Sequence, residues 1–505
     1  MRRNQLNFLG FCLLLCGIVD IKAIPTIRKA YAEPKMTQQI RYIQSLRKPF
    51  RVVTSNQEPV LPSSVDHSKS IFFPPIINQD GGSCAQASGI GYMFTYEMNR
   101  LLGRDASISA ANRFSYLFSW NMLNGGEDQG GFVDEGLFLA ERYGMMTEDD
   151  YGTSSVYSFR WASGYEKYLH ALHYRTSEII TMADSIPLMK RYLYDCGNGS
   201  QPGGVLTFST QSSNWKIDDN YQGPSATGYH SILLKLATLG SHALTIAGYD
   251  DLVSYTDDSG HKHTGAFIVV NSWGSYSHDN GRFYLPYDFF RDPSISTTQL
   301  SNEVIGVKVT TFTPQIVFKV NLNYSSRNDL SFAVGGSDKT SAKEPTEFYY
   351  STAFRNQGGD YPMQGHWSDG NFEFALDFST HPLSNGNNFR RYFLEVIRSS
   401  RGNNLGEGSL DGVQVIDYRT TPPRIYSYRD ALPSQIQLGE NVYTIPVDPR
   451  YVISASPYRY LNVSGTASNK LFLLHTASGN HAKMQVSSYD KSSGCVSLHY
   501  TVLNH

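Results

Sequence analysis

The stretch Asn78-Gln79-Asp80-Gly81-Gly82-Ser83-Cys84 joins a glycine-rich turn to the start of a predicted helix. Beyond the cysteine, small and apolar residues recur at spacings of three and four as far as Gly103; they are Ala87, Ile90, Gly91, Phe94, Met98 and Leu101. This spacing predicts a buried helix that begins at Cys84. Because a helix N-terminus offers a positive dipole end and unpaired N–H groups, we expect the thiolate form of Cys84 to be favoured.

Two later stretches supply partners for a thiolate. Residues 241–249 read Ser-His-Ala-Leu-Thr-Ile-Ala-Gly-Tyr, which sets His242 at the mouth of an apolar strand. Residues 267–274 read Phe-Ile-Val-Val-Asn-Ser-Trp-Gly, which sets Asn271 at the end of another. A thiolate is a nucleophile, and a neighbouring histidine completes its activation.

The three stretches resemble the signatures of the papain-like cysteine proteases, and they occur in that family's order. The family shows Gln and a Gly/Ser/Cys turn before Cys, then His-Ala before an apolar strand, then Asn-Ser-Trp-Gly. The resemblance implies that Cys84 attacks a peptide carbonyl, that His242 holds the thiolate and protonates the leaving amine, and that Asn271 orients the imidazole. It also implies that Trp273 shields this hydrogen bond and that Gln79 donates its amide to the oxyanion, beside the backbone N–H of Cys84.

Each of these residues alone has a simpler interpretation. A lone cysteine is usually a small buried hydrophobe, and a lone histidine is usually a core or surface residue with ordinary partners. Asn-Ser before Trp-Gly is also typical of a turn. The three stretches taken together favour catalysis over these separate interpretations.

The chain departs from the family pattern at two places. The family separates Gln and Cys by six residues, whereas Gln79 precedes Cys84 by five, and Asn78 occupies the sixth position. A tightened turn that keeps Gln79 as the donor is preferred here. Ala85 follows the nucleophile where relatives carry Trp, which removes a packing contact and no catalytic group.

Other motifs lie around these three. Gly130-Gly131 resembles the family's loop that pairs with substrate backbone, where side chains would block a peptide strand; a helix-entry turn is the alternative. Helices are predicted at 133–143, closed by Gly144, and at 186–194, with a strand at 203–208. The next thirty residues form an insertion of unknown shape. Asp257-Asp258-Ser259-Gly260 is an oxygen-rich loop that could bind calcium, although a hairpin tip is favoured.

Composition indicates a large, nearly neutral protein. The chain has 505 residues, enough for two to four domains, and its 43 basic and 45 acidic residues nearly cancel. No basic face for nucleic acid is apparent, and no cofactor or metal is expected. The 34 Tyr and 27 Phe favour β-rich modules of extracellular type.

The N-terminus has the pattern of an export signal. Arg2 and Arg3 precede an apolar run in residues 1–23, so we expect secretion, a periplasmic location or cell-surface display; a lipid anchor at Cys16 is disfavoured because Leu15 is not small. Residues 24–60 read equally as a short pro-segment or a disordered linker. Cys196 and Cys495 form either a bridge or two buried thiols.

The predicted fold class is α+β. A papain-like two-lobed domain at 61–312, with a helical lobe and a β-barrel-like lobe, is followed by an all-β sandwich at 313–449 and a β module at 450–505. Period-two alternation marks the sandwich strands, as in the set Ile316, Phe318, Val320 and Leu322. Sandwich aromatics either pack the core, which is favoured, or stack on sugars of a surface ligand.

Two functions remain open. The first is a secreted cysteine peptidase that acts on proteins or peptides. The second is a surface binding or adhesion protein whose papain-like domain is weakly active or inactive. Because every catalytic motif lies before residue 275, the sequence predicts that residues 313–505 are dispensable for hydrolysis of small peptides.

Overall fold

The computed structural model describes most of the chain between residues 44 and 503. The described ranges are 44–53, 59–152, 159–237, 239–257, 260–291, 300, 303–355, 357–366, 368, 370–379, 389–399, 406–447, 453–454, 471–475, 481–489 and 496–503. The predicted export signal, Cys495 and most of the predicted pro-segment lie outside them. Among the described residues, no helix is long and apolar enough to cross a membrane.

The helix predicted after the cysteine is present. It runs continuously through α3 (Cys84–Gln86), the π-helix η3 (Ala87–Phe94) and α4 (Thr95–Leu102), and it ends at Gly103, whose φ is +64°. The prediction is wrong for Leu101, which is 52% exposed. A π-helix bonds to the fifth residue along the chain, so its turns hold more than 3.6 residues and rotate later positions off the buried face.

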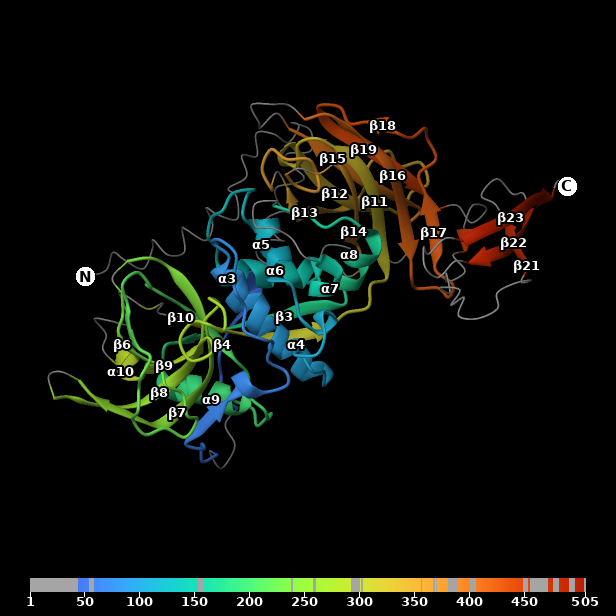
Figure 1. The fold of residues 1–505 in the computed structure, drawn as a ribbon. Coiled ribbons are helices and arrows are strands. Elements are labelled where there is room, and N and C mark those ends of the chain that lie inside the picture. Colours follow the sequence, from blue (N-terminus) through green and yellow to red (C-terminus); the bar gives the residue numbers. More distant parts are fainter. Residues whose placement is uncertain are drawn as a thin grey trace.

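Helices α5 to α8 gather around this one, whereas α9 and α10 lie against the large sheet (Figure 1). The bounds of these helices are α5 (Tyr116–Leu123), α6 (Val133–Tyr143), α7 (Glu148–Tyr151), α8 (Tyr165–Ala171), α9 (Ile186–Asp195) and the short α10 (Asp288–Arg291). The helices predicted at 133–143 and 186–194 are confirmed as α6 and α9. The stripe that predicted α6, namely Val133, Leu137, Ala140 and Tyr143, is buried, and Gly144 follows the helix with φ +68°.

One large sheet brings two of the motifs to the same end of two neighbouring strands. Its order is β1-β3-β10-β4-β7-β8-β9-β6-β5, with β2 paired to β7. The strands are β1 (Arg47–Pro49), β2 (Ser64–Asp66), β3 (Tyr174–Ala183), β4 (Leu206–Thr210), β5 (Lys216–Asp218), β6 (Ile232–Lys235), β7 (His242–Thr256), β8 (Lys262–Val270), β9 (Arg282–Pro286) and β10 (Glu303–Thr311). Thr245 of β7 pairs with Val270 of β8. The start of β7 and the end of β8 therefore lie side by side, together with His242 and Asn271.

The predicted all-β module is present as two sheets. One has the order β14-β11-β16-β17-β20 with β18 on β16, and the other β13-β12-β15-β19. The strands are β11 (Ile316–Tyr324), β12 (Leu330–Ser337), β13 (Glu347–Arg355), β14 (Asn371–Asp377), β15 (Arg391–Arg398), β16 (Gly408–Asp417), β17 (Arg424–Ser427), β18 (Ser434–Gln435), β19 (Gly439–Pro446) and β20 (Ile453–Ser454). Most of their aromatic side chains are buried, which confirms the core interpretation for them.

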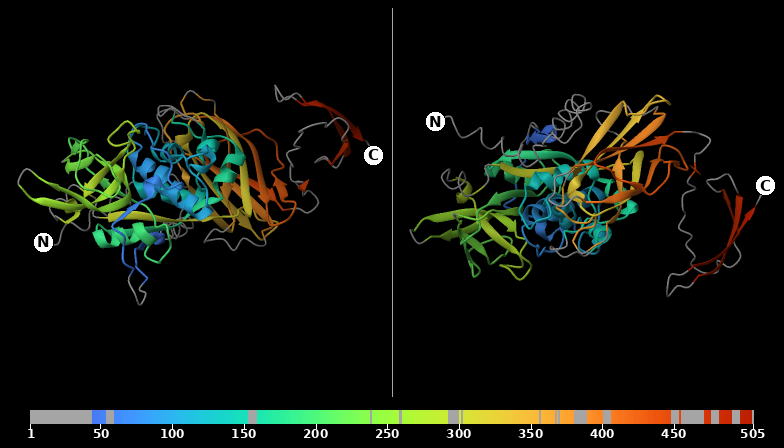
Figure 2. Two further views of the ribbon diagram at one scale, coloured as in Figure 1. Left: turned by 60° about the horizontal axis from the view of Figure 1, so that its bottom comes forward. Right: turned by 90° about the horizontal axis from the view of Figure 1, so that it is seen from above.

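Helices α3 to α8 lie between the large sheet and this sandwich, as the three views agree (Figures 1 and 2). Helices and sandwich share one hydrophobic core, in which Trp161 and Tyr168 contact Phe354 and Phe372. Arg175 and Asp377 form a buried ion pair of 2.8 Å across the boundary. The two parts are therefore joined by packing as well as by the chain.

The two ends of the described chain differ in how they join the rest. β1 pairs in parallel with β3, so residues 47–49 belong to the large sheet. Near the C-terminus, β21 (Leu471–His475), β22 (His481–Tyr489) and β23 (Val496–Leu503) form a separate antiparallel sheet. The predicted domain boundaries at 60, 312 and 449 stay predictions.

Candidate active site

Cys84 is the first residue of α3, and the large sheet lies beside it. Burial raises the pKa of its thiol above the usual value, and the nearby backbone groups of Ala243, Ala85 and Cys84 itself lower it by less. The expectation that the helix N-terminus favours the thiolate of Cys84 is therefore wrong when the thiol is considered without a charged partner. Desolvation disfavours the charged form by more than the backbone N–H groups favour it.

His242 and Asn271 meet through a short hydrogen bond. Nε2 of His242 lies 2.8 Å from Oδ1 of Asn271, and the same oxygen accepts a 2.8 Å bond from the backbone N–H of Ser272. Nε2 must then donate, which leaves Nδ1 of the neutral ring as a proton acceptor. Burial lowers the pKa of His242, while the bond to Asn271 acts in the opposite direction.

Two tryptophans enclose the imidazole. The ring of Trp273 stacks on His242 with centroids 4.7 Å apart and planes 25° apart. Trp215 packs edge-on, 6.2 Å from His242 and 5.2 Å from Trp273. The sequence singled out Trp273 and missed Trp215, which lies in the insertion after β4. A lone tryptophan in a segment without periodicity carries no signal that would have found it.

Gln79 is held by the loop that follows Asn271. Its backbone N–H donates to Ser272 O at 2.7 Å, and its Oε1 accepts a 2.5 Å bond from Ser272 Oγ. Its Nε2 donates to Gly81 O at 2.9 Å. Asn78, in contrast, is exposed and accepts a 3.1 Å bond from the hydroxyl of Tyr276. The structure therefore brings Gln79, and not the side chain of Asn78, to the strand end that carries His242 and Asn271.

The Gly130-Gly131 loop lies against the turn before Cys84. Oδ1 of Asp128 accepts a 2.7 Å bond from the backbone N–H of Gly82. A Cβ added at Gly82 would lie 2.8 Å from the carbonyl carbon of Gln129 and 3.0 Å from the nitrogen of Gly130. The two backbones touch, so the candidate substrate loop and the nucleophile turn are fixed to each other.

Tyr92 of the π-helix η3 links separate parts of the candidate site through its hydroxyl. Its hydroxyl donates to Asn271 O at 2.9 Å and accepts from the backbone N–H of Ile77 at 2.7 Å. The nucleophile helix, the asparagine and the chain leading to Gln79 are thus linked by one buried phenol. The sequence analysis did not single out Tyr92.

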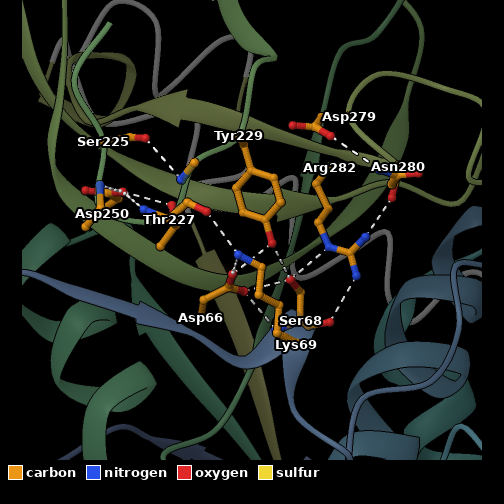
Figure 3. Close-up of polar contacts among 12 residues, drawn as sticks. Asp66, Ser68, Lys69, Ser225, Thr227, Tyr229, Asp250, Asp279, Asn280 and Arg282 are labelled. Atoms are coloured by element: carbon orange, nitrogen blue, oxygen red, sulfur yellow. Dashed lines mark hydrogen bonds and ion pairs between the residues drawn. The ribbon is translucent and has the colours of Figure 1, made fainter. Parts of the chain in front are cut away.

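A second polar cluster anchors the insertion (Figure 3). Asp66 accepts from the Tyr229 hydroxyl at 2.8 Å and pairs with Lys69 at 3.3 Å, and Arg282 Nε donates to Ser68 Oγ at 2.9 Å. Asp250 Oδ2 accepts from both the backbone N–H and the hydroxyl of Thr227. These groups satisfy one another, so the cluster pins the insertion to the start of the large-sheet domain.

Comparisons with known proteins give likenesses of shape. No protein-family model and no curated protein matches the chain. Xylellain, a cysteine protease from Xylella fastidiosa, resembles it at TM-score 0.36 and 17% identity, over 51% of this chain and 91% of xylellain. Procathepsin B S9 from Trypanosoma congolense resembles it at TM-score 0.37 and 16% identity, over 54% of this chain and 84% of the procathepsin. Digestive procathepsin L 3 of Tenebrio molitor larval midgut resembles it at TM-score 0.35 and 18% identity, over 54% of this chain and 78% of the procathepsin. At TM-scores this low, the likenesses do not decide the activity.

Proposed function

We propose that the protein is a papain-like cysteine peptidase with Cys84, His242 and Asn271 as its catalytic residues. The observation that carries the proposal is the 2.8 Å bond from His242 to Asn271, with the Cys84 thiol against the backbone of Ala243, the next residue along. A helix-borne nucleophile, a base and a group that orients the base are what acyl transfer by a thiol needs. The two lobes are the helices around η3 and the sheet that carries β7 and β8.

The proposed reaction starts from a neutral pair. The Cys84 proton moves to Nδ1 of His242 as sulfur attacks the peptide carbonyl carbon, and the oxyanion is stabilised by the Cys84 backbone N–H and the Gln79 amide. The imidazolium then gives its proton to the leaving amine, which leaves a thioester. Water, deprotonated by His242, attacks the thioester and releases the carboxylate product and the thiol.

The resting protonation state follows from two opposing influences. Burial raises the pKa of Cys84 and lowers that of His242, which favours thiol and imidazole. Mutual attraction within a thiolate–imidazolium pair works the other way, and the two groups titrate as a unit. The pH profile of alkylation at Cys84 measures the balance, because only the thiolate reacts quickly.

A covalent label tests the proposal. An epoxide inhibitor of cysteine peptidases should add the mass of one inhibitor molecule to the chain, located on Cys84. The variant Cys84→Ala should lose both labelling and peptide hydrolysis while its circular dichroism spectrum stays unchanged. Cys196, also free and half-buried, is the matched control, and Cys196→Ser should keep both. Hydrolysis that survives in Cys84→Ala would remove the assignment.

The alternative is a binding protein with a weak or inactive catalytic domain. The raised pKa of Cys84 and the bond that ties Gln79 Nε2 to Gly81 O are the observations in its favour. A folded chain that neither takes the label nor cleaves any member of a proteome-derived peptide mixture would favour this function.

Export is a separate proposal that rests on the Arg2-Arg3 start and the apolar run after it. Expression of the full chain with N-terminal sequencing of the extracellular, periplasmic and membrane fractions tests it. A chain that keeps Met1 in the cytosolic fraction alone would contradict it.

A further inference from the structure

A cluster of two histidines and a carboxylate lies at the far end of the β7–β8 hairpin. His261 and His263 stand two residues apart, and Asp288 begins α10. One potential ligand atom from each of the three lies within 4.8 Å of the others. His263 and Asp288 already meet, with Nδ1 and Oδ2 2.7 Å apart. We propose that these three side chains form a binding site for a divalent transition metal such as zinc.

The chemistry of the donors selects the class of ion. Two imidazoles and one carboxylate suit zinc and its neighbours, whereas calcium and magnesium prefer oxygen donors throughout. Zinc with ligands at about 2.0–2.1 Å sets neighbouring donor atoms about 3.3 Å apart in a tetrahedron. His261 is exposed, and its ring packs edge-on against His263 with centroids 4.7 Å apart. Metal binding would turn this ring and open the 2.7 Å contact between His263 and Asp288 to the tetrahedral separation. Three protein ligands leave the fourth position of the tetrahedron to water.

A fourth residue, Asp257, supports the proposed metal site from outside the three ligands. Nε2 of His263 lies 3.1 Å from Oδ2 of Asp257, and Oδ1 of Asp257 accepts a 2.9 Å bond from the backbone N–H of His261. Histidine ligands of metals characteristically donate their second ring N–H to a carboxylate, which fixes tautomer and orientation. Asp257 therefore stands where such a partner belongs, and the metal takes the place of the proton between His263 and Asp288.

Asp288 is oriented from its other side. Its Oδ1 accepts a 2.6 Å bond from Arg291 Nη1, one turn further along α10. Oδ2 is left to face His263 and the metal. The ring of His263 also stacks on Tyr255 with centroids 4.5 Å apart, which restrains its plane. His263 and Asp288 are thus held next to each other before an ion binds.

The metal would cross-link the hairpin to α10, away from the candidate active site. His263 and Asn271 are separated by eight residues of extended chain, which corresponds to roughly 26 Å. The proposal is therefore independent of the proposed peptidase activity. An ion bound only by the folded chain raises the free energy of unfolding in proportion to the logarithm of its concentration.

The test uses the full chain without a polyhistidine tag, in the Cys84→Ala background, which removes the competing thiol at the candidate active site. After chelator treatment, calorimetric titration with zinc chloride should give one equivalent per chain, and zinc should raise Tm. His261→Gln should weaken zinc binding at least a hundredfold and abolish the rise in Tm. Because His261 is exposed, this variant is expected to fold.

Two further variants refine the outcome. Asp257→Asn should keep one site and weaken it about 10–100-fold, as expected for a residue that supports a ligand. The matched control is His170→Gln, which removes a histidine paired 2.6 Å from Asp150 and should leave zinc binding unchanged. The proposal is overturned if the parent chain shows no saturable zinc binding at micromolar concentrations, or if His261→Gln binds zinc as the parent does.

Discussion

The hydroxyl of Ser272 donates a 2.5 Å hydrogen bond to Oε1 of Gln79. Its neighbour Asn271 orients His242, so one dipeptide holds both the imidazole and the amide proposed to face the oxyanion. With its oxygen fixed by Ser272, the Gln79 amide presents Nε2 on the opposite side. One N–H of Nε2 goes to Gly81 O, and the second is the one proposed to face the oxyanion.

Gln79→Ala should lower kcat with little change in KM, because the oxyanion forms only during the reaction. Loss of one such donor costs about 10²–10³ in rate, or roughly 3–4 kcal/mol. Asn78→Ala, in the adjacent exposed position, is the control and should cost much less. Both variants are compared on one peptide substrate, with inhibitor labelling to verify that Cys84 still reacts. A crippled Asn78→Ala beside a nearly normal Gln79→Ala would mean that the wrong donor was chosen.

Gly130→Ala should raise KM and leave Tm unchanged. A Cβ at this position would lie 3.9 Å from Gly82 O, an ordinary contact, so the free protein has room for it. Crowding arises only when a peptide strand lies against the loop. Steady-state kinetics and thermal unfolding give the two readouts. Gly103→Ala, at the C-terminus of α4 and away from the loop, is the kinetic control. An unchanged KM in Gly130→Ala would mean that substrate backbone does not approach there.

Local signals explain which parts of this fold were predictable. The spacing after Cys84 and the stripe of α6 repeat a helical period, and apolar strands flanked the motifs at His242 and Asn271. What was missed depends on contacts between distant segments. Trp215 reaches His242 only through the fold of an insertion, and the pKa of Cys84 is raised by burial, which no local pattern reports. The core that the helices and the sandwich share was missed for the same reason, because it also depends on contacts between distant segments.

That core reverses the expectation that residues 313–505 are dispensable. Deletion would expose Trp161 and Tyr168, which are 1% and 2% exposed in the whole chain. It would also leave Arg175 without Asp377, and breaking a buried ion pair costs about 3–5 kcal/mol. Burial of one large apolar side chain contributes about 1.5–3 kcal/mol, so these losses approach the 5–15 kcal/mol stability of a typical domain.

A chain that ends at residue 312 should therefore be unfolded or aggregated, and inactive on small peptides. Circular dichroism and resistance to a second protease measure folding, and a fluorogenic peptide measures activity. A chain that ends at residue 455 keeps both sandwich sheets and is the control, expected to fold. A soluble, active chain of residues 1–312 would restore the original expectation.

The loop between Gly125 and Gly131 links the sandwich to the candidate site. A Cβ at Gly126 would lie 2.5 Å from Gly358 O, so the sandwich loop touches this turn directly. Gly358 has φ +86°, and a Cβ there would lie 2.3 Å from Arg327 Nε. Gly358→Ala should consequently destabilise the chain and lower activity together. A loss of activity at unchanged Tm would indicate that the sandwich positions the loop without stabilising it, and unchanged Tm and activity would exclude both roles.

Glu135 predicts a pH dependence of stability. Burial raises its pKa from 4.5 to about 7, against the bond from the Phe132 backbone N–H to its Oε2. The folded chain therefore holds a proton that the unfolded chain loses between these values. Stability from this group is present below pH 4.5 and is lost as pH rises through about 7. Urea unfolding across this window should show a falling free energy of unfolding.

Glu135→Gln should flatten that slope while keeping the cap of α6, because the Gln carbonyl accepts the same backbone bond. Glu166→Gln changes an exposed glutamate in the first turn of α8 and should leave the slope as it is. Since a Cβ at Gly131 would lie only 3.1 Å from Glu135 Oε2, the charge that appears near pH 7 stands beside the candidate substrate loop. KM for a peptide with an acidic side chain bound at this loop should then rise across the same window, and Glu135→Gln should abolish the rise. A slope of unfolding free energy that persists in Glu135→Gln would assign the pH dependence to another group.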